Sequence, residues 1–357
     1  MRYRRIAGTD IDVSEIGFGV WTVAAGWWGD FSDDEAAALL REARELGITF
    51  FDTAETYGNG RGETVLAHAF PGAERDKIVI GTKFGYDWQH RAADKQAGHQ
   101  EAEHNWDPAF LETALRGSLE RLGTDRIDHW QLHNPRMDAL QRDDLWTFLE
   151  KIQREGHVRS IGVALGPAIG WQEEGEYAMA HRPAHTVQMI YNALELDPGR
   201  ALLRAAKESG TSLLVRVPHS SGMLEGQYTA DTVFAENDHR RHRPRAWLLN
   251  GLKKIDQLGF LTDDGATLGQ KALRYVLRDP AIVSALPNIY NREQLLEFAA
   301  ASDVADIDDA QEATITSLFE ANYGLPVEQE AGLNPETQRR HEAAKAPAQT
   351  AEGSASR

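Results

Sequence analysis

Cysteine is absent from this chain of 357 residues. Disulfide bonds, thiolate catalysis and cysteine-ligated zinc are therefore excluded. Long apolar runs are absent too, because no stretch approaches the roughly 20 residues that cross a bilayer. Residues 1–10 also lack the apolar core of a secretory signal. We therefore expect a cytoplasmic protein with no membrane partner.

Positive charge is scarce relative to negative charge. The chain has 38 Lys and Arg against 55 Asp and Glu, which gives a formal net charge of -17. An acidic surface repels a phosphate backbone, so we expect no nucleic-acid partner. An anionic cofactor would need a local basic pocket on such a protein.

Short apolar and β-branched runs alternate with segments of helical spacing along most of the chain. The runs that predict strands are residues 16–18, 48–51, 78–82, 127–132, 158–163, 186–190, 212–217 and 282–285. The main segments that predict helices are residues 33–46, 63–70, 110–122, 143–155, 199–209, 268–278 and 292–301. This alternation favours a parallel sheet, and eight repeats favour an α/β fold of the (β/α)8 barrel type over an open sheet. No GxGxxG follows the first strand, which further weakens the open alternative.

Some segments do not fit the strand-helix repeat. Residues 2–13 predict a β-hairpin ahead of the first strand. Residues 86–106 and 218–265 are long loops on the side of the barrel where substrate-binding loops lie. We expect one barrel domain over residues 1–323 and a disordered tail over residues 324–357, which are rich in Glu, Gln, Ala and Pro.

Four polar residues follow three successive predicted strands. Asp52 and Tyr57 follow the second strand, Lys83 follows the third, and His133 follows the fourth. Because the carboxyl ends of barrel strands converge on one mouth, we expect these side chains to meet there. They are our candidate catalytic residues.

The chemistry of these residue types suggests how they would work together. An aspartate beside a buried lysine holds its ammonium, and the held positive charge favours the phenolate of a neighbouring tyrosine. We therefore expect Tyr57 to act as a general acid and base, giving its proton to a carbonyl oxygen while hydride reaches the carbon. His133 would orient the carbonyl or share the proton.

Several motifs occur in the order typical of one known family. They are residues 51–58 (Phe-Asp-Thr-Ala-Glu-Thr-Tyr-Gly), 81–83 (Gly-Thr-Lys), 131–133 (Gln-Leu-His) and 159–163 (Arg-Ser-Ile-Gly-Val), with further matches at 17–19, 188–192 and 285–287. Over residues 3–301 the chain resembles the aldo-keto reductases. The resemblance implies an oxidoreductase that transfers hydride between NADP(H), or alternatively NAD(H), and a small carbonyl, alcohol or sugar-like substrate.

The sequence departs from the family pattern where the nicotinamide would be held. Family members usually carry Ser-Asn after the fifth strand, whereas this chain has Ala164 and Leu165. Gln188 is then the evident remaining partner of the nicotinamide amide. After the seventh strand, Arg216 and Val217 replace the usual Tyr-Ser. Arg216 either stacks on the ring through its planar guanidinium or binds an anionic group.

Further departures lie at the nucleotide end of the expected cofactor site. Tyr290 replaces the basic residue that usually follows the eighth strand, and Phe298 replaces an asparagine that usually meets adenine. The candidate cofactor contacts on this side are Asn288, Arg292, Gln294 and Glu297. The sequence therefore leaves the choice between NADP(H) and NAD(H) open.

Candidate substrate contacts follow the first, third and seventh strands. They are Trp21, Trp27, Trp28, Phe84 and His219. Tryptophans at a barrel mouth either stack on flat ligands and sugar rings or lie buried beneath a loop, and the sequence supports both arrangements equally.

The two long loops carry histidines that raise the question of a metal. They are His90, His99, His104, His239 and His242. Their spacing matches no familiar zinc pattern, so we expect no metal. We interpret them as loop surface or substrate contacts.

Two alternatives to hydride transfer stay open at this point. The same candidate residues suit a redox-neutral acid-base step, such as an elimination or epimerisation, with or without a retained nicotinamide cofactor. The chain also suits a ligand-sensing relative without turnover. The complete set of four residues disfavours that second alternative, because a non-catalytic protein has no need of a tuned phenol. No pattern in the sequence indicates an oligomeric state.

Overall fold

The computed structural model describes residues 1–89, 102–166, 169–236 and 238–326. Most of the predicted tail at residues 324–357 therefore lies outside the described residues, as do His90 and His99. In the described ranges, no helix has both the length and the apolar character needed to cross a membrane.

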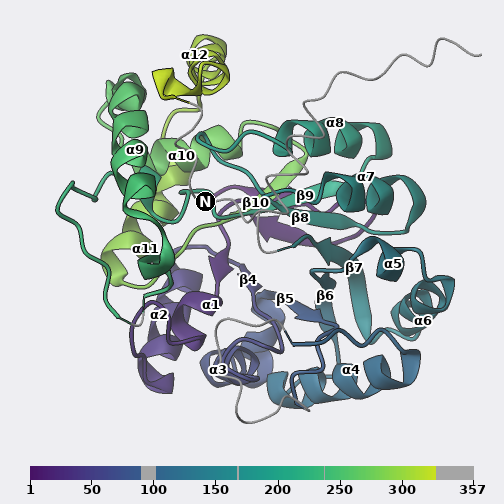
Figure 1. Cartoon of the computed structure of the whole chain (residues 1–357). Helices are drawn as coiled ribbons and strands as arrows, with labels where there is room; N and C mark the ends of the chain where they lie inside the picture. The colour runs from purple at the N-terminus through teal and green to yellow at the C-terminus, as the bar shows by residue number, and fades with distance from the viewer. Residues whose placement is uncertain (90–101, 167–168, 237, 327–357) are drawn as a thin grey trace, which may run out of the picture.

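Eight parallel strands form the sheet at the centre of the molecule (Figure 1). They are β3 (Phe18–Gly19), β4 (Phe50–Asp52), β5 (Val79–Phe84), β6 (Ile127–His133), β7 (Val158–Ala164), β8 (Thr186–Ile190), β9 (Ser212–Arg216) and β10 (Ile282–Leu286). Neighbours in the sheet follow chain order from β3 to β10. The two ends of the sheet meet because Gly17 N donates to Ala285 O and Ala285 N donates to Glu15 O, each at 2.8 Å. The predicted (β/α)8 barrel is confirmed.

Helices surround the strands (Figure 1). They are α1 (Trp21–Ala24), α2 (Asp33–Glu45), α3 (Arg61–Ala69), α4 (Pro108–Leu122), α5 (Met137–Leu140), α6 (Asp143–Arg154), α7 (Gln172–His181), α8 (Gly199–Ser209), α10 (Leu268–Val276) and α11 (Arg292–Ala299). Helix α2 shows how the sequence sets a boundary: Ser32 and Glu35 form a reciprocal capping box at its start. Its apolar stripe then packs into the core around the barrel.

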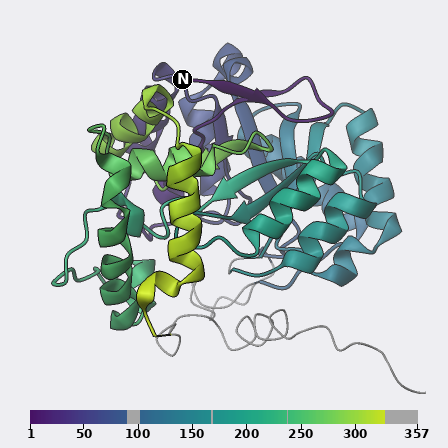
Figure 2. The same cartoon turned by 90° about the horizontal axis from the view of Figure 1, so that it is seen from above.

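The predicted hairpin closes the amino-terminal end of the barrel (Figure 2). Its strands are β1 (Tyr3–Arg5) and β2 (Asp12–Ser14), which pair antiparallel. Ile6, Ile11 and Val13 pack against residues inside the barrel, including Phe50. Arg4 fastens the hairpin by donating to the carbonyl of Ile282 at 2.7 Å. The opposite, carboxyl end of the strands stays available for a site.

The long loop predicted at residues 218–265 contains structure of its own. Short helical turns η2 (Met223–Glu225) and η4 (Asp256–Thr262) flank helix α9 (Arg245–Ile255). Helix α12 (Asp309–Glu320) follows the last repeat. Figures 1 and 2 both show α9 and α12 beside one another at one edge of the barrel.

Candidate functional site

The structure brings the predicted catalytic residues together at the barrel mouth. Lys83 Nζ lies 2.5 Å from Asp52 Oδ1 and 3.1 Å from the Tyr57 hydroxyl, and it also donates to the Thr53 carbonyl at 2.8 Å. The rings of Tyr57 and His133 meet edge to face, with centroids 6.0 Å apart. One ammonium therefore links a carboxylate and a phenol beside an imidazole.

The strand register explains this convergence. Asp52 is the last residue of β4 and pairs with Gly81 of β5, so Lys83 lies just beyond it on the neighbouring strand. His133 ends β6 in the same way. Tyr57 reaches the site through a turn at Gly58, where φ is 59° and a Cβ atom would lie 2.4 Å from the Ala24 carbonyl oxygen. Glycine is therefore required directly after the tyrosine.

The electrostatics of the site favour a charged lysine and a neutral histidine. Burial opposes charge on Lys83, but Asp52 and Tyr57 outweigh burial and raise the pKa of Lys83 above its usual range. Burial lowers the pKa of His133 well below its ordinary value, and the nearby charges of Lys83 and Arg216 lower it further. The imidazole is thus uncharged at neutral pH.

Gln188 lies inside the network around Asp52. Its Nε2 donates to Asp52 Oδ2 at 3.0 Å, and Gln131 Nε2 donates to the same oxygen at 3.0 Å. Both carboxylate oxygens of Asp52 are therefore held, one by the ammonium and one by two amides. The residue that the resemblance assigned to the nicotinamide amide also fixes the aspartate.

A wall of aromatic rings lies beside His133, and of its members only His104 was considered from the sequence, as loop surface or a substrate contact. The Tyr86 ring meets the His133 ring edge to face, with centroids 5.0 Å apart, and stacks on the His104 ring, with centroids 4.1 Å apart. His104 stacks in turn on Trp106 and hydrogen-bonds through Nε2 to the carbonyl of His133 at 2.9 Å. Gly85 permits this arrangement, because a Cβ atom there would lie 2.3 Å from the Trp106 ring. In the sequence, the only indication of this wall was Gly85, a glycine directly after the aromatic residue Phe84 at the end of a strand.

Arg216 reaches from the end of β9 to the residues that follow β7, which is two strands away in the sheet. Its Nη2 donates to the carbonyl of Leu165 at 2.9 Å and also to the carbonyl of Gly166. The next residue, Val217, has a φ of 55°, a left-handed conformation that is strained for a β-branched side chain. A strained turn thus holds a guanidinium where the resemblance implies an aromatic ring.

The candidate cofactor residues after β10 have separate surroundings. Asn288 is half-buried in the turn that follows the strand. Gln294 is buried and donates to Glu225 at 2.9 Å, while Glu297 accepts from Thr267 at 2.5 Å. The Arg292 side chain is exposed, and its Nε donates to Glu42 at 2.8 Å.

The candidate substrate residues do not form one cluster. Trp21 packs against both Trp27 and Trp28, with ring centroids 6.1 and 6.0 Å apart. Phe84 is fully buried and stacks on Trp130. His219 is also buried; its Nε2 bonds to the Gly269 carbonyl, and its ring packs on Phe298.

Arg240 connects three loops at the rim of the barrel. Its guanidinium lies 4.3 Å from the ring centre of Trp28, which stacks on Tyr290 after β10. It is paired with Asp238 at 2.5 Å and donates to the Tyr228 hydroxyl at 2.5 Å. Arg240 therefore has a carboxylate partner and lies within a cage of aromatic rings.

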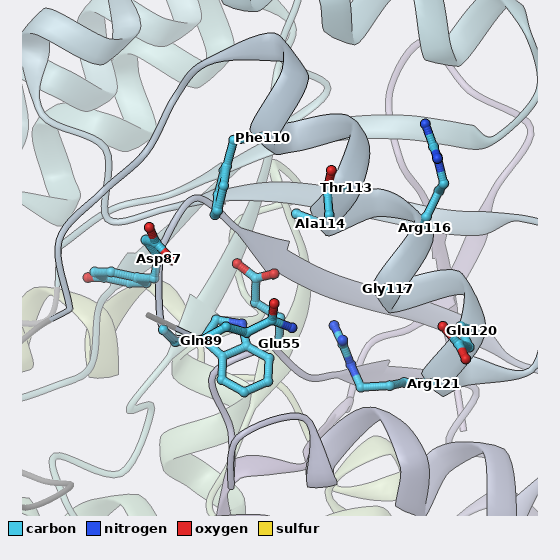
Figure 3. Close-up of a pocket in the computed structure, with 12 residues that line it drawn as sticks. Glu55, Asp87, Gln89, Phe110, Thr113, Ala114, Arg116, Gly117, Glu120 and Arg121 are labelled. Atoms are coloured by element: carbon cyan, nitrogen blue, oxygen red, sulfur yellow. The ribbon is translucent and has the colours of Figure 1, made fainter. Parts of the chain in front are cut away.

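A cavity of about 220 Å³ lies between helix α4 and the segment after β5 (Figure 3). None of the four predicted catalytic residues lines it. Figure 3 shows the Glu55 carboxyl at its centre, among Phe110, Asp87 and Arg121. Gly85 N donates to Glu55 Oε1 at 3.1 Å. Burial, assisted by the charge of Glu63, raises the pKa of Glu55 to about 8.

No cluster of three or more potential metal ligands occurs among the residues that the structure describes. His104 is part of the aromatic wall described above. The side chains of His239 and His242 lie outside the described part of the structure.

Comparisons with known proteins agree on one family. The family model described as "Aldo/keto reductase family" matches residues 15–320. The aldo-keto reductase YhdN of Bacillus subtilis is 29% identical over 294 residues, covering 80% of this chain and 84% of that protein. The NADH-specific methylglyoxal reductase of Escherichia coli is 28% identical over 324 residues, covering 88% and 97%. A glycerol dehydrogenase structure from Gluconobacter oxydans superposes with a TM-score of 0.75 at 22% identity, covering 93% and 98%, a likeness of fold.

Proposed function

The chain belongs to the aldo/keto reductase family, and we propose that it reduces a small aldehyde or ketone with Tyr57 as the proton donor. Membership identifies it as an oxidoreductase of the NAD(P)H-dependent kind. The observation that carries the proposal is the buried chain of contacts from Asp52 through Lys83 to the Tyr57 hydroxyl. The same arrangement runs the reverse oxidation of an alcohol.

The proton-donor role follows from the charge beside the phenol. As Tyr57 gives its proton to a carbonyl oxygen, negative charge develops on the phenol oxygen, 3.1 Å from the Lys83 ammonium. That ammonium is buried and stays charged because Asp52 holds it at 2.5 Å. A fixed positive charge at low dielectric stabilises the developing phenolate.

His133 would orient the substrate rather than exchange protons. Because its pKa lies well below the ordinary value, it is a neutral imidazole at neutral pH. A neutral imidazole offers one N–H donor to a carbonyl oxygen without competing for the proton of Tyr57. Tyr86 and His104 would form the aromatic wall beside that oxygen.

The side chains at the mouth fit a nicotinamide cofactor. The amide of Gln188 and the guanidinium of Arg216 are planar hydrogen-bonding groups beside the catalytic residues, and both suit a carboxamide. When bound, the nicotinamide would supply the hydride. Relatives include a protein named for NADH specificity, so we include both NADH and NADPH as candidates.

The experiment follows the consumption of NADH and of NADPH with a panel of small aldehydes and ketones. We expect the Tyr57→Phe protein to keep its cofactor affinity and to lose turnover about 10²- to 10⁴-fold, because only the proton donor is removed. Tyr3→Phe, at a half-exposed tyrosine that begins strand β1 of the hairpin at the opposite end of the barrel, is the matched control. Unchanged turnover in Tyr57→Phe would contradict the assignment, and cofactor that binds but is never consumed would favour a redox-neutral reaction.

A further inference from the structure

The cavity beside α4 is separate from the candidate catalytic residues. It lies between that helix and residues 86–89, which follow β5, and none of the four candidate catalytic residues lines it. Its volume of about 220 Å³ is far more than a single water molecule needs. Gln89, Thr113 and Arg116 on its border are exposed, so the cavity is reached from solvent. A small organic molecule therefore has both room and access.

Glu55 supplies the buried polar group of this cavity. The residue is 2% exposed, and Figure 3 shows its carboxyl pointing into the cavity. The peptide N–H of Gly85 donates to its Oε1 at 3.1 Å, and the peptide N–H of Glu55 donates to the Lys83 carbonyl at 3.3 Å. These two bonds attach Glu55 to the end of β5. The carboxyl is thus held inside the cavity rather than turned toward solvent.

Glu55 has no ion-pair partner among the residues that the structure describes. Two arginines line the cavity, but each is paired with another carboxylate. Arg121 Nε lies 2.7 Å from Glu63 Oε2, and Arg116 Nη2 lies 2.7 Å from Glu112 Oε1. The charge of Glu63 disfavours ionisation of Glu55 more than the charge of Arg121 favours it. The two arginines therefore leave the Glu55 carboxyl without a compensating positive charge.

Aromatic rings form the apolar part of the lining. They belong to Tyr86, Trp88 and Phe110. The Trp88 ring already has a cation beside it, because the Arg121 guanidinium lies 5.6 Å from its centre. The Phe110 ring is half-buried, and within the described part of the chain it pairs with no other ring. An open aromatic face next to an uncompensated carboxyl is an arrangement that attracts an organic cation.

We propose that this cavity binds a small organic cation, an ammonium group on an apolar body, with Glu55 as its counter-ion and Phe110 beside its apolar part. The ammonium would supply the positive charge that the Glu55 carboxylate lacks, and the apolar body would cover the Phe110 ring. A neutral molecule brings no such charge, and an anion would meet a carboxylate. Binding there does not require the proposed reduction, because the catalytic residues lie elsewhere.

Cation binding would release a proton from Glu55. Because burial raises the pKa of Glu55 to about 8, its carboxyl is mostly protonated at pH 7. An ammonium beside the carboxyl favours the ionised form, so binding should release about one proton at pH 7, and affinity should rise about tenfold from pH 6 to pH 7. The titratable and charged groups around the carboxyl are Glu63 on α3, Tyr86 and Asp87 after β5, and Arg116, Glu120 and Arg121 on α4.

The test uses benzylamine as the cation, with benzyl alcohol and benzoate as its neutral and anionic counterparts. Calorimetry on the intact protein, in two buffers of different ionisation enthalpy, measures the affinity and the number of protons released. At pH 7 we expect benzylamine to bind about tenfold more tightly than benzyl alcohol, with release of about one proton, and benzoate not to bind.

Glu55→Gln should remove both the preference for benzylamine and the proton release, because it keeps the acceptor for Gly85 N but carries no charge. Glu120→Gln, at an exposed residue on the same cavity, is the matched control and should change the affinity by less than about twofold.

Several results would overturn the proposal. They are benzyl alcohol binding as tightly as benzylamine, benzylamine binding without release of a proton, and binding of none of the three probes. Unchanged benzylamine affinity in Glu55→Gln also overturns it, because the probe then binds elsewhere on the protein. If Glu55→Gln does not fold, Phe110→Ala locates the probe instead. Weaker benzylamine binding in Phe110→Ala supports the cavity, and unchanged affinity there overturns the proposal.

Discussion

Glu55 permits a direct test of how burial controls ionisation near the barrel mouth. Its carboxyl lies inside the cavity of Figure 3, and burial is the main reason that its pKa rises from 4.5 to about 8. Glutamine has nearly the same shape and keeps an oxygen that accepts from Gly85 N, but it never carries charge. Glu55→Gln therefore removes the titration and keeps the contacts.

The sign and size of the effect follow from linkage. The folded protein holds the Glu55 proton more tightly than the unfolded chain, so stability falls as pH rises from about 4.5 through about 8. The full difference in the pKa of Glu55 between the unfolded and folded states lowers the free energy of unfolding by roughly 5 kcal/mol at high pH. About 3 kcal/mol of it falls between pH 6 and pH 9. For a protein of this size, about 3 kcal/mol corresponds to roughly 4 °C in the unfolding temperature.

Thermal unfolding of both proteins at pH 6 and pH 9 measures this difference. Other groups titrate equally in both proteins, so the difference between the two proteins gives the contribution of Glu55 alone. Between pH 6 and pH 9, we expect the unfolding temperature of the unaltered protein to fall by roughly 4 °C more than that of Glu55→Gln. Glu120→Gln, at an exposed residue on the same cavity, is the matched control and should behave like the unaltered protein. Equal losses in the unaltered and Glu55→Gln proteins would refute the reasoning.

Two further predictions concern the catalytic residues. Lys83→Met should abolish reduction and, by leaving Asp52 buried without its cation, lower the free energy of unfolding by about 3–5 kcal/mol. In urea unfolding, the additional change Asp52→Asn should recover part of that loss without restoring turnover, and full stability in Lys83→Met alone would contradict the pairing. His133 should stay neutral, so its ring signals in NMR should not change between pH 8 and pH 6. A titration midpoint near 6.5 would show that burial and Lys83 do not control it.

The barrel was predictable because most of its strands are short, buried apolar runs, and in this alternating sequence such runs indicate strands. Residues 127–132 are predicted as a strand, and β6 spans Ile127–His133 with every residue buried. The first strand was harder to define, because the predicted run 16–18 has two roles. Ile16 bridges to Ala285 and closes the barrel, while β3 begins at Phe18. Barrel closure depends on residues 269 positions apart in sequence, which local pattern does not report.

Helix α7 was not predicted, because its sequence lacks the usual apolar stripe. Its buried residues include Glu174 and Gly175 beside Ala178 and Met179. A glycine lies there because a Cβ atom would be 2.5 Å from Leu202 of α8, so close packing replaces apolar side chains. Periodicity detects helices that bury large apolar residues, and this helix buries a backbone surface instead.

The four candidate catalytic residues could be predicted from the sequence, whereas the contacts of Glu225 and Arg240 in the loop after β9 could not. Asp52 and Lys83 mark strand ends, and the topology of a barrel alone brings strand ends together. Glu225 is joined to Gln294 across 69 positions by the folding of one loop, and Arg240 meets Trp28 in the same way. Loop conformation is set by contacts such as these rather than by local propensity, so the sequence alone does not reveal them.

The departures from the family pattern at Ala164, Leu165 and Arg216 are physically linked. A buried strand end leaves backbone carbonyl groups that need donors. Arg216 supplies donors to the carbonyls of Leu165 and Gly166, which places its planar cation beside the residues that follow β7. A tyrosine at position 216 would offer one hydroxyl and could not serve two carbonyls in this way. The change at position 216 is therefore best understood together with the loss of the polar pair after β7, as one rearranged surface for the nicotinamide end of the proposed cofactor.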